Sequence, residues 1–522
     1  MKVSIRALLC AATAVMPVLG ETFTNPVLWE DLADLDIFRV DDTFYYSASN
    51  MHYSPAAPIL SSKDLVNWEY IGHSVPTLDF GSKYDMANGE TAYVKGIYAS
   101  TMRYRASNKT WYWYGCIEYT GTYVYTAPSA AGPWTQAAKI SQCYYDAGLL
   151  IDEDDDTMYV AYGNTELSVA KLSSDGLSQS QAQVVYNTPS SIGTLEGSRM
   201  YKKDGAYYIF VTRPANGQYV LKSTSGPFGP YEIKELLLNL GSPIPNGGVP
   251  HQGGLVDTQN GDWFYMAFID SYPGGRVPTL APITWGSDGF PSLELVNNAW
   301  GVSYTAPLPL TPVSHTGTDN FSGTELGPQW EWNHNPDTTK FSVSDGLTLN
   351  TATVTDDLYH ARNTLSHRIL GPTSSGTFVL DISSMADGDR AGVAALRDSS
   401  AWIGVLKDGS TTKLSMYSGL TMTSSWATSS TGSEVASAAL SGTKVWLRIY
   451  ADINVGTGKQ AEFYYSTDGE SYTKLGSLEM GNKWEFFIGY RYAVFNFATK
   501  ALGGSVVVEE FTVDAPGKTT EG

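Results

Sequence analysis

The sequence feature that most constrains the fold is a motif that recurs five times in the first 310 residues. Each copy is a charged or polar turn followed directly by a strand rich in aromatic residues. The copies begin at Asp41, Asn108, Asp155, Asp204 and Asn260, so they lie about 45 to 70 residues apart. This spacing is typical of the four-stranded blades of a β-propeller. We therefore predict an all-β chain that begins with a five-bladed propeller, in preference to a generic run of hairpins.

Beyond the fifth copy, the repeat stops at a proline-rich stretch, Ala306–Pro312, which is typical of a rigid linker. The segments that follow alternate apolar and polar residues, as at 378–382, 445–450 and 505–513, and predict a β-sandwich of the concanavalin or jelly-roll type. The predicted domains are a propeller over residues 21–310, a linker over 311–318 and a sandwich over 319–522.

The first 20 residues have the composition of a secretory signal. Lys2 and Arg6 precede a mostly apolar run that ends at Gly20 and is too short to span a bilayer. We therefore expect a secreted, extracellular protein. In that setting the sequons at Asn108 and Asn320 predict a glycoprotein.

The mature chain is strongly acidic. The formal charge of −20 becomes −22 after cleavage, because the signal carries two cations and no acidic residue. Such a charge argues against nucleic acid and anionic membranes as partners. Cys116 and Cys143 remain, and the sequence leaves open whether they form a disulfide or stay free thiols. A monomer is expected.

Three of the five predicted blades carry a carboxylate at the same place in the repeat. The innermost strand of a blade lines the central channel and begins about eight or nine residues before each turn. The residues found there are Asp34, Ala99, Asp146, Glu196 and His251. Because converging carboxylates raise one another's pKa, one can stay protonated while another is ionised. This division of roles suits the cleavage of a glycosidic bond.

Carboxylates beside a histidine also suit a calcium ion, so a bare ion site is the competing interpretation. Glycosidic hydrolysis itself requires no cofactor, and calcium or water near His251 stays open. The acidic run Asp152–Asp156 lies at a predicted hairpin turn, where a solvated turn is favoured over a calcium loop.

Residues 25–285 resemble glycoside hydrolase family 43, whose members are five-bladed propellers. The motifs that carry the resemblance occur in order, at 33–40, 98–104, 146–150, 196–199, 251–254 and 275–276. The resemblance implies that Asp34 is the general base, Glu196 the general acid, and Asp146 the group that orients the acid and tunes its pKa. It also implies substrate contacts for a further set, namely His52, Tyr98, His251 and Arg276.

The sequence departs from the family pattern at two positions. Leu35 follows Asp34 where the family usually has proline, and this leaves Asp36 as a rival base. On an extended strand the side chains of Asp34 and Asp36 face the same side, so parity does not separate them. Tyr98 stands where the family usually has tryptophan, which implies a reshaped sugar pocket.

In the C-terminal part, the stretches at 330–336, 361–365 and 388–392 resemble the β-sandwich appended to β-xylosidases and arabinofuranosidases of this family. The motifs at 50–55 and 98–100 resemble those of its fungal α-L-arabinofuranosidases. That likeness implies an inverting, exo-acting enzyme that removes terminal arabinofuranosyl side chains from arabinoxylan or another arabinose-bearing plant polysaccharide, such as arabinan. By the same likeness, the α-1,3 bond on doubly substituted xylose is the expected target. The alternatives are a β-xylosidase with the same machinery and a non-catalytic sugar-binding propeller. A retaining enzyme of the invertase type is disfavoured, because its Arg-Asp-Pro and Glu-Cys motifs do not occur.

Overall fold

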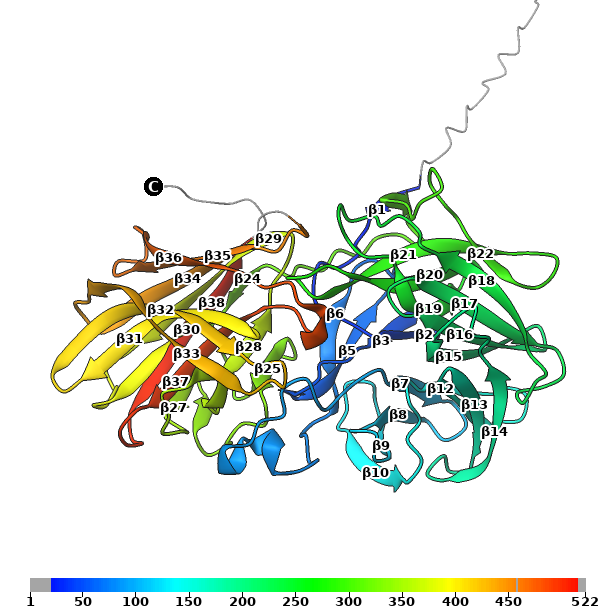
Figure 1. Cartoon of the computed structure of the whole chain (residues 1–522), viewed down its shortest axis with the longest axis horizontal. Coiled ribbons are helices and arrows are strands. Elements are labelled where there is room, and N and C mark those ends of the chain that lie inside the picture. Colours follow the sequence, from blue (N-terminus) through cyan, green and yellow to red (C-terminus); the bar gives the residue numbers. More distant parts are fainter. Residues whose placement is uncertain (1–19, 457–458, 515–522) are drawn as a thin grey trace, which may run out of the picture.

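The computed structural model describes residues 20–456 and 459–514, so the predicted signal lies outside the described residues except for Gly20. Two all-β bodies stand side by side in Figure 1, a propeller in blue to green and a sandwich in yellow to red. The only helices in the described part are four short 3₁₀ segments, and none of them is long and apolar enough to cross a membrane.

Five four-stranded antiparallel sheets form the propeller, which confirms the five predicted blades. The first three blades consist of β2 (Asp36–Val40), β3 (Thr43–Ser47), β5 (Ala56–Ser62) and β6 (Glu69–Val75); β7 (Thr101–Arg105), β8 (Thr110–Cys116), β9 (Thr122–Ala127) and β10 (Thr135–Ile140); and β11 (Gly148–Ile151), β12 (Met158–Asn164), β13 (Glu166–Leu172) and β14 (Gln179–Asn187). The last two consist of β15 (Glu196–Lys203), β16 (Ala206–Arg213), β17 (Gly217–Ser223) and β18 (Glu232–Leu238); and β19 (His251–Asp257), β20 (Trp263–Asp270), β21 (Arg276–Trp285) and β22 (Pro291–Leu293).

The recurring turn joins the first and second strands of each blade. In the fourth blade, Asp204 and Gly205 have φ values of 50° and 77°, as a two-residue hairpin with left-handed central residues requires. The strands then pair from Lys203 opposite Ala206. The aromatic residues after the turn lie on the second strand and pack between blades. The propeller is closed where β1 (Thr22–Thr24) pairs with β23 (Ser303–Thr305), which joins its beginning to its end.

Two eight-stranded sheets form the sandwich, and its first strand begins at Gly317. One sheet has the order β26 (Phe341–Val343), β27 (Leu347–Asn350), β38 (Ser505–Asp514), β29 (Thr373–Asp381), β34 (Lys444–Asp452), β35 (Gln460–Ser466) and β36 (Thr473–Glu479), with β24 (Gly317–Asp319) also paired to β38. The other has the order β33 (Thr428–Ala439), β32 (Thr411–Met422), β31 (Ser399–Asp408), β30 (Asp389–Leu396), β37 (Arg491–Ala498), β28 (Leu365–Arg368), β25 (Trp330–Asn333) and β4 (Tyr53–Ser54).

The last strand of that order ties the two domains together. β4 belongs by sequence to the first blade, yet Tyr53 and Ser54 pair with Asn333 and Trp332 of β25. The propeller thus supplies an edge strand to the sandwich. Backbone hydrogen bonds continue from one domain into the other and fix how the sandwich sits against the propeller.

Candidate active site

The innermost strands of neighbouring blades pack closely around the channel. A Cβ added to Gly148 on β11 would lie 2.5 Å from the carbonyl oxygen of Ser198 on β15, so only glycine fits there. A cavity of about 790 Å³ lies where these innermost strands begin. The cavity brings together the three predicted carboxylates, Asp34, Asp146 and Glu196.

A left-handed backbone residue stands at or directly after each of these carboxylates. Asp34 and Asp146 lie two residues before β2 and β11 and have φ values of 56° and 50°; Glu196 begins β15 and is followed by Gly197 at φ 66°. Aspartate tolerates this left-handed conformation better than most residues. The repeat therefore places a left-handed kink at Asp34 and Asp146 and directly after Glu196, near the beginning of three innermost strands.

The same kink separates Asp34 from Asp36. The expectation that both face one side assumed an extended strand, and it is wrong because Asp34 is left-handed. The side chain of Asp36 is fully buried away from the cavity. Its Oδ2 accepts hydrogen bonds from Thr101 Oγ1 at 2.6 Å, Met102 N at 3.0 Å and Arg103 at 2.6 Å. Asp36 therefore ties the first blade to the second.

Three donors converge on the carboxylate of Asp34. Ser49 Oγ donates to Oδ2 at 2.7 Å, while Gln252 Nε2 and an Arg276 guanidinium nitrogen donate to Oδ1 at 3.0 and 3.2 Å. An ionised carboxylate accepts all three bonds without carrying a proton itself. These contacts hold Asp34 in place as an acceptor, which is the state that a general base needs.

The other two carboxylates, Asp146 and Glu196, are near enough for the charge of one to act on the other. Asp146 Oδ2 accepts a hydrogen bond from Gly197 N at 3.0 Å, so Asp146 is tied to the residue after Glu196. Burial, and then the negative charges of Glu196 and Asp34, raise the pKa of Asp146. Burial also raises the pKa of Glu196. Asp146 and Glu196 are therefore poised to hold a proton at a pH where an exposed carboxyl would lose it.

Arg199 is a residue of the site to which the sequence analysis assigned no role. It is 1 % exposed, and its guanidinium donates to the carbonyl oxygens of Asp34 and Leu35, at 2.7 and 3.0 Å, and of Ala147 and Ser198, at 2.8 and 2.9 Å. These carbonyls belong to the segments that carry the three carboxylates. One side chain thus fixes their relative positions.

Three of the four predicted substrate contacts line the cavity: Tyr98, His251 and Arg276. The guanidinium of Arg276 lies between the rings of Phe268 and Phe487, 5.1 and 4.9 Å from their centroids. His251 Nδ1 donates to the carbonyl of Val249 at 2.9 Å, and burial lowers the pKa of His251, which favours the neutral ring. No group of three or more His, Cys, Asp or Glu among the described residues is arranged to hold a metal ion.

His52 does not line the cavity, and the prediction that it contacts the substrate is wrong in this structure. It is fully buried at the domain boundary, where its ring lies 4.6, 4.8 and 4.9 Å from those of Tyr53, Tyr93 and His334. Its Nδ1 accepts a hydrogen bond from Val94 N at 3.3 Å. His52 is buried because it packs against His334 of the sandwich, a contact that the propeller repeat does not predict.

The sandwich itself forms part of the cavity wall. Trp484 and Phe487, which belong to the segment before β37, line the cavity together with the propeller residues. Because Phe487 packs against Arg276, and Arg276 donates to Asp34, the sandwich touches the group that holds the predicted base. Tyr272 OH also donates to the carbonyl of Phe487 at 3.2 Å.

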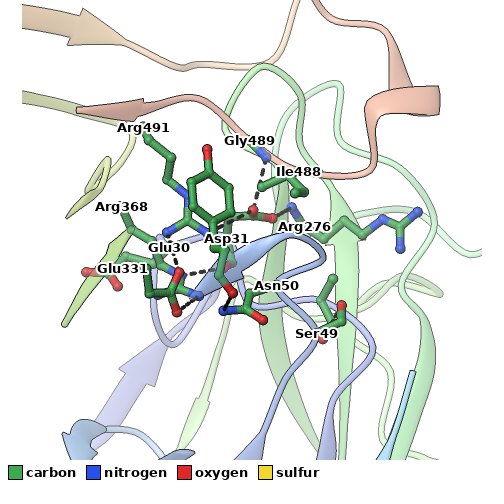
Figure 2. Close-up of polar contacts among 12 residues, drawn as sticks. Glu30, Asp31, Ser49, Asn50, Arg276, Glu331, Arg368, Ile488, Gly489 and Arg491 are labelled. Atoms are coloured by element: carbon green, nitrogen blue, oxygen red, sulfur yellow. Dashed lines mark hydrogen bonds and ion pairs between the residues drawn. The ribbon is translucent and has the colours of Figure 1, made fainter. Parts of the chain in front are cut away.

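Asp31 fastens this segment to the propeller (Figure 2). Its Oδ1 accepts a hydrogen bond from Arg276 N at 2.9 Å, and its Oδ2 accepts one from Gly489 N at 3.0 Å. Arg368 Nε donates to the carbonyl of Asp31 at 2.8 Å, and Arg491 lies nearby against Glu331. One buried carboxylate thus links the backbone of Arg276 to the sandwich segment that carries Phe487.

Cys116 and Cys143, whose state the sequence left open, form a disulfide. The bond joins the end of β8 to the segment that leads into Tyr145 and Asp146. It therefore anchors the loop with Tyr119, another residue of the cavity wall, to the segment that carries Asp146.

Comparison with known proteins assigns the fold to a family. Residues 23–291 match the model of glycosyl hydrolases family 43. The chain belongs to glycoside hydrolase family 43. Residues 318–514 match a second model, that of the β-xylosidase C-terminal concanavalin A-like domain, which confirms the predicted sandwich.

Similar proteins match between 62 % and 95 % of the chain. A β-xylosidase from Formosa agariphila is 30 % identical over 95 % of this chain and 91 % of its own. A non-reducing end α-L-arabinofuranosidase from Bacteroides ovatus is 30 % identical over 62 % of this chain and 64 % of its own. A solved structure with 48 % identity, a TM-score of 0.92 and coverage of 95 % of this chain and 99 % of its own is an engineered family 43 enzyme described as displaying endo-xylanase and exo-arabinofuranosidase activity. The fungal branch expected from the sequence stays a prediction.

Proposed function

We propose that this family 43 enzyme removes single terminal pentoses from arabinoxylan with inversion, with Asp34 as base and Glu196 as acid. The observation that carries the proposal is the cavity, in which a carboxylate held by three donors and two carboxyls of raised pKa lie together. In this mechanism Glu196 protonates the glycosidic oxygen, while Asp34 takes a proton from the water that attacks the opposite face of the sugar. Asp146 orients Glu196 through the backbone of Gly197.

The enclosure of the cavity supports exo action. Propeller residues form most of its wall, and Trp484 and Phe487 of the sandwich complete it. A pocket of this kind accepts a terminal or side-chain sugar more readily than the middle of a chain. We extend the proposal to units that carry two arabinoses, with cleavage of the α-1,3 bond, as the sequence analysis expected.

Two pentosides compete as the substrate. The names of similar proteins favour β-xylosidase, since both the Formosa agariphila relative and the model of the C-terminal domain carry that name. β-Xylosidase is also the alternative that the sequence predicted. The 48 % identical structure supports exo-arabinofuranosidase activity, and its identity is well above the 30 % of either curated relative. We therefore place α-L-arabinofuranosides first and β-D-xylosides second.

Paired aryl glycosides test this order. We expect kcat/KM for an aryl α-L-arabinofuranoside to exceed that for the matching β-D-xyloside by at least about 10-fold, because a shaped pocket distinguishes the two sugars by roughly 1–3 kcal/mol. Arabinoxylan oligosaccharides of known branching then identify the natural bond. Free arabinose with an intact xylan chain supports the proposal.

Other products would assign a different activity. Xylose released stepwise from linear xylo-oligosaccharides, with little arabinose, would establish the β-xylosidase. Sugar binding without turnover of either aryl glycoside would contradict hydrolysis and favour a sugar-binding propeller.

A further inference from the structure

Both hydrogen bonds to the carboxyl of Glu196 end on the same oxygen. Tyr145 OH donates to Oε2 at 3.1 Å, and Asn164 Nδ2 donates to Oε2 at 2.5 Å. Among the described residues, Oε1 has no hydrogen-bond partner. The two oxygens of this carboxyl are therefore not equivalent.

We propose that Tyr145 and Asn164 are positioning residues that confine the proton of Glu196 to Oε1, the oxygen that delivers it to the leaving group. The inference rests on the proposed function, because it assumes that Glu196 is the acid. A carboxyl oxygen has two lone-pair sites, and two donors occupy both sites of Oε2. A proton placed on Oε2 would point at the NH₂ hydrogen of Asn164 or would require the Tyr145 hydroxyl to stop donating and accept instead, so Oε1 is the favoured site for the proton.

The neighbours of both donors fix their direction. Asn164 Oδ1 accepts a hydrogen bond from Thr165 Oγ1 at 3.0 Å, which orients the amide so that its NH₂ group faces Glu196. The ring of Tyr145 stacks on that of Tyr119, with centroids 5.9 Å apart and planes 19° apart. Burial and the charges of Asp146 and Glu196 raise the pKa of Tyr145, so its hydroxyl keeps the proton that it donates.

The two donors also act on the pKa of Glu196. Burial raises that pKa and Asp34 adds to the rise, whereas the hydrogen bonds from Tyr145 and Asn164, together with Arg276, lower it. The two donors therefore limit the rise in the pKa of Glu196, so that its carboxyl can still give up its proton. The titratable groups that share the cavity stay the same in the variants described next: Asp34, Tyr98, Tyr119, Asp146, His251, Asp270 and Arg276.

The test is the pH dependence of kcat/KM on an aryl glycoside for Tyr145→Phe, Asn164→Ala and the double variant. Each substitution removes one bond that favours the ionised form, so the pKa of Glu196 rises and the alkaline limb moves to higher pH. We expect a shift of about one pH unit for each, because a hydrogen bond to a charged group is worth about that much. Tyr144→Phe is the matched control, because Tyr144 directly precedes Tyr145 in the chain and does not line the cavity. The variant loses a hydroxyl that donates to Gln179 at 3.0 Å, and the alkaline limb should stay where it is.

A second readout separates the position of the proton from its pKa. At a pH where Glu196 is protonated in every variant, the double variant should lose about 10-fold in kcat on an oligosaccharide with a poor leaving group, and much less on an activated aryl glycoside. An alkaline limb that stays within about 0.2 pH units of wild type in both single variants would overturn the inference. If wild-type enzyme hydrolyses no glycoside, the proposed function fails first, so the two failures are distinguishable.

Discussion

Replacing Glu196 with glutamine is expected to slow the hydrolysis of natural oligosaccharides by at least about 10²-fold, because the amide has no proton to donate to the glycosidic oxygen. The hydrogen bonds from Tyr145 and Asn164 end on an oxygen that the amide also carries, so the fold around position 196 should survive. An activated aryl glycoside needs little protonation to depart, and we expect its turnover to fall much less. Steady-state rates on both substrate classes measure the split.

The assignment of Glu196 as the acid depends on the difference between its effects on oligosaccharides and on activated aryl glycosides. Equal losses on poor and good leaving groups would contradict a proton-donating role for Glu196. Asp146→Asn provides a contrast, because Asp146 contacts Gly197 N and orients the acid through the backbone. If the split between leaving groups appears in Asp146→Asn and not in Glu196→Gln, the two roles are reversed.

Replacing Asp34 with asparagine should abolish turnover on every substrate, by roughly 10³- to 10⁴-fold, because no other group activates the attacking water. Leaving-group ability should not matter, since the base acts on the water. The residual rates of purified Asp34→Asn on aryl glycosides and oligosaccharides measure this.

Asp36→Asn is the matched control for the base. Its carboxylate accepts three hydrogen bonds outside the cavity and lies 3.6 Å from Arg199, so we expect lower stability and a far smaller loss of turnover per folded molecule than in Asp34→Asn. Chemical denaturation measures the loss of stability, and a separate titration of active sites in the native enzyme gives the turnover per folded molecule. Loss of turnover in Asp36→Asn with activity retained in Asp34→Asn would mean that the wrong aspartate was assigned.

The blades could be predicted because their signal is local and repeated. A polar turn and an aromatic strand occur within about six residues, and Asp204 and Gly205 show that the turn itself has the expected left-handed geometry. The carboxylates followed from the same repeat, since equivalent positions in equivalent blades face one channel. The sandwich strands were placed nearly as well: the strand expected at 505–513 is β38, Ser505–Asp514.

Residues whose role depends on distant parts of the chain could not be predicted. Phe487 reaches the cavity from another domain, and His52 is covered by His334 of that domain, so no pattern near either residue reveals its surroundings. The side of the strand that Asp34 faces depended on a single φ angle, which alternation of apolar and polar residues does not report. Arg199 belongs to the motif at 196–199, but its role could not be predicted because its four carbonyl partners come from three blades.

The anomer that is formed first tests the central claim most directly. Inversion requires Asp34 to activate water on one face while Glu196 protonates the leaving group on the other, and a sugar released in this way has the opposite anomeric configuration to its glycoside. Proton NMR of wild-type enzyme with an aryl α-L-arabinofuranoside, recorded before mutarotation, should show β-arabinofuranose as the first product. First-formed α-arabinofuranose would show that the configuration is retained, and would contradict Asp34 as a base that acts through water.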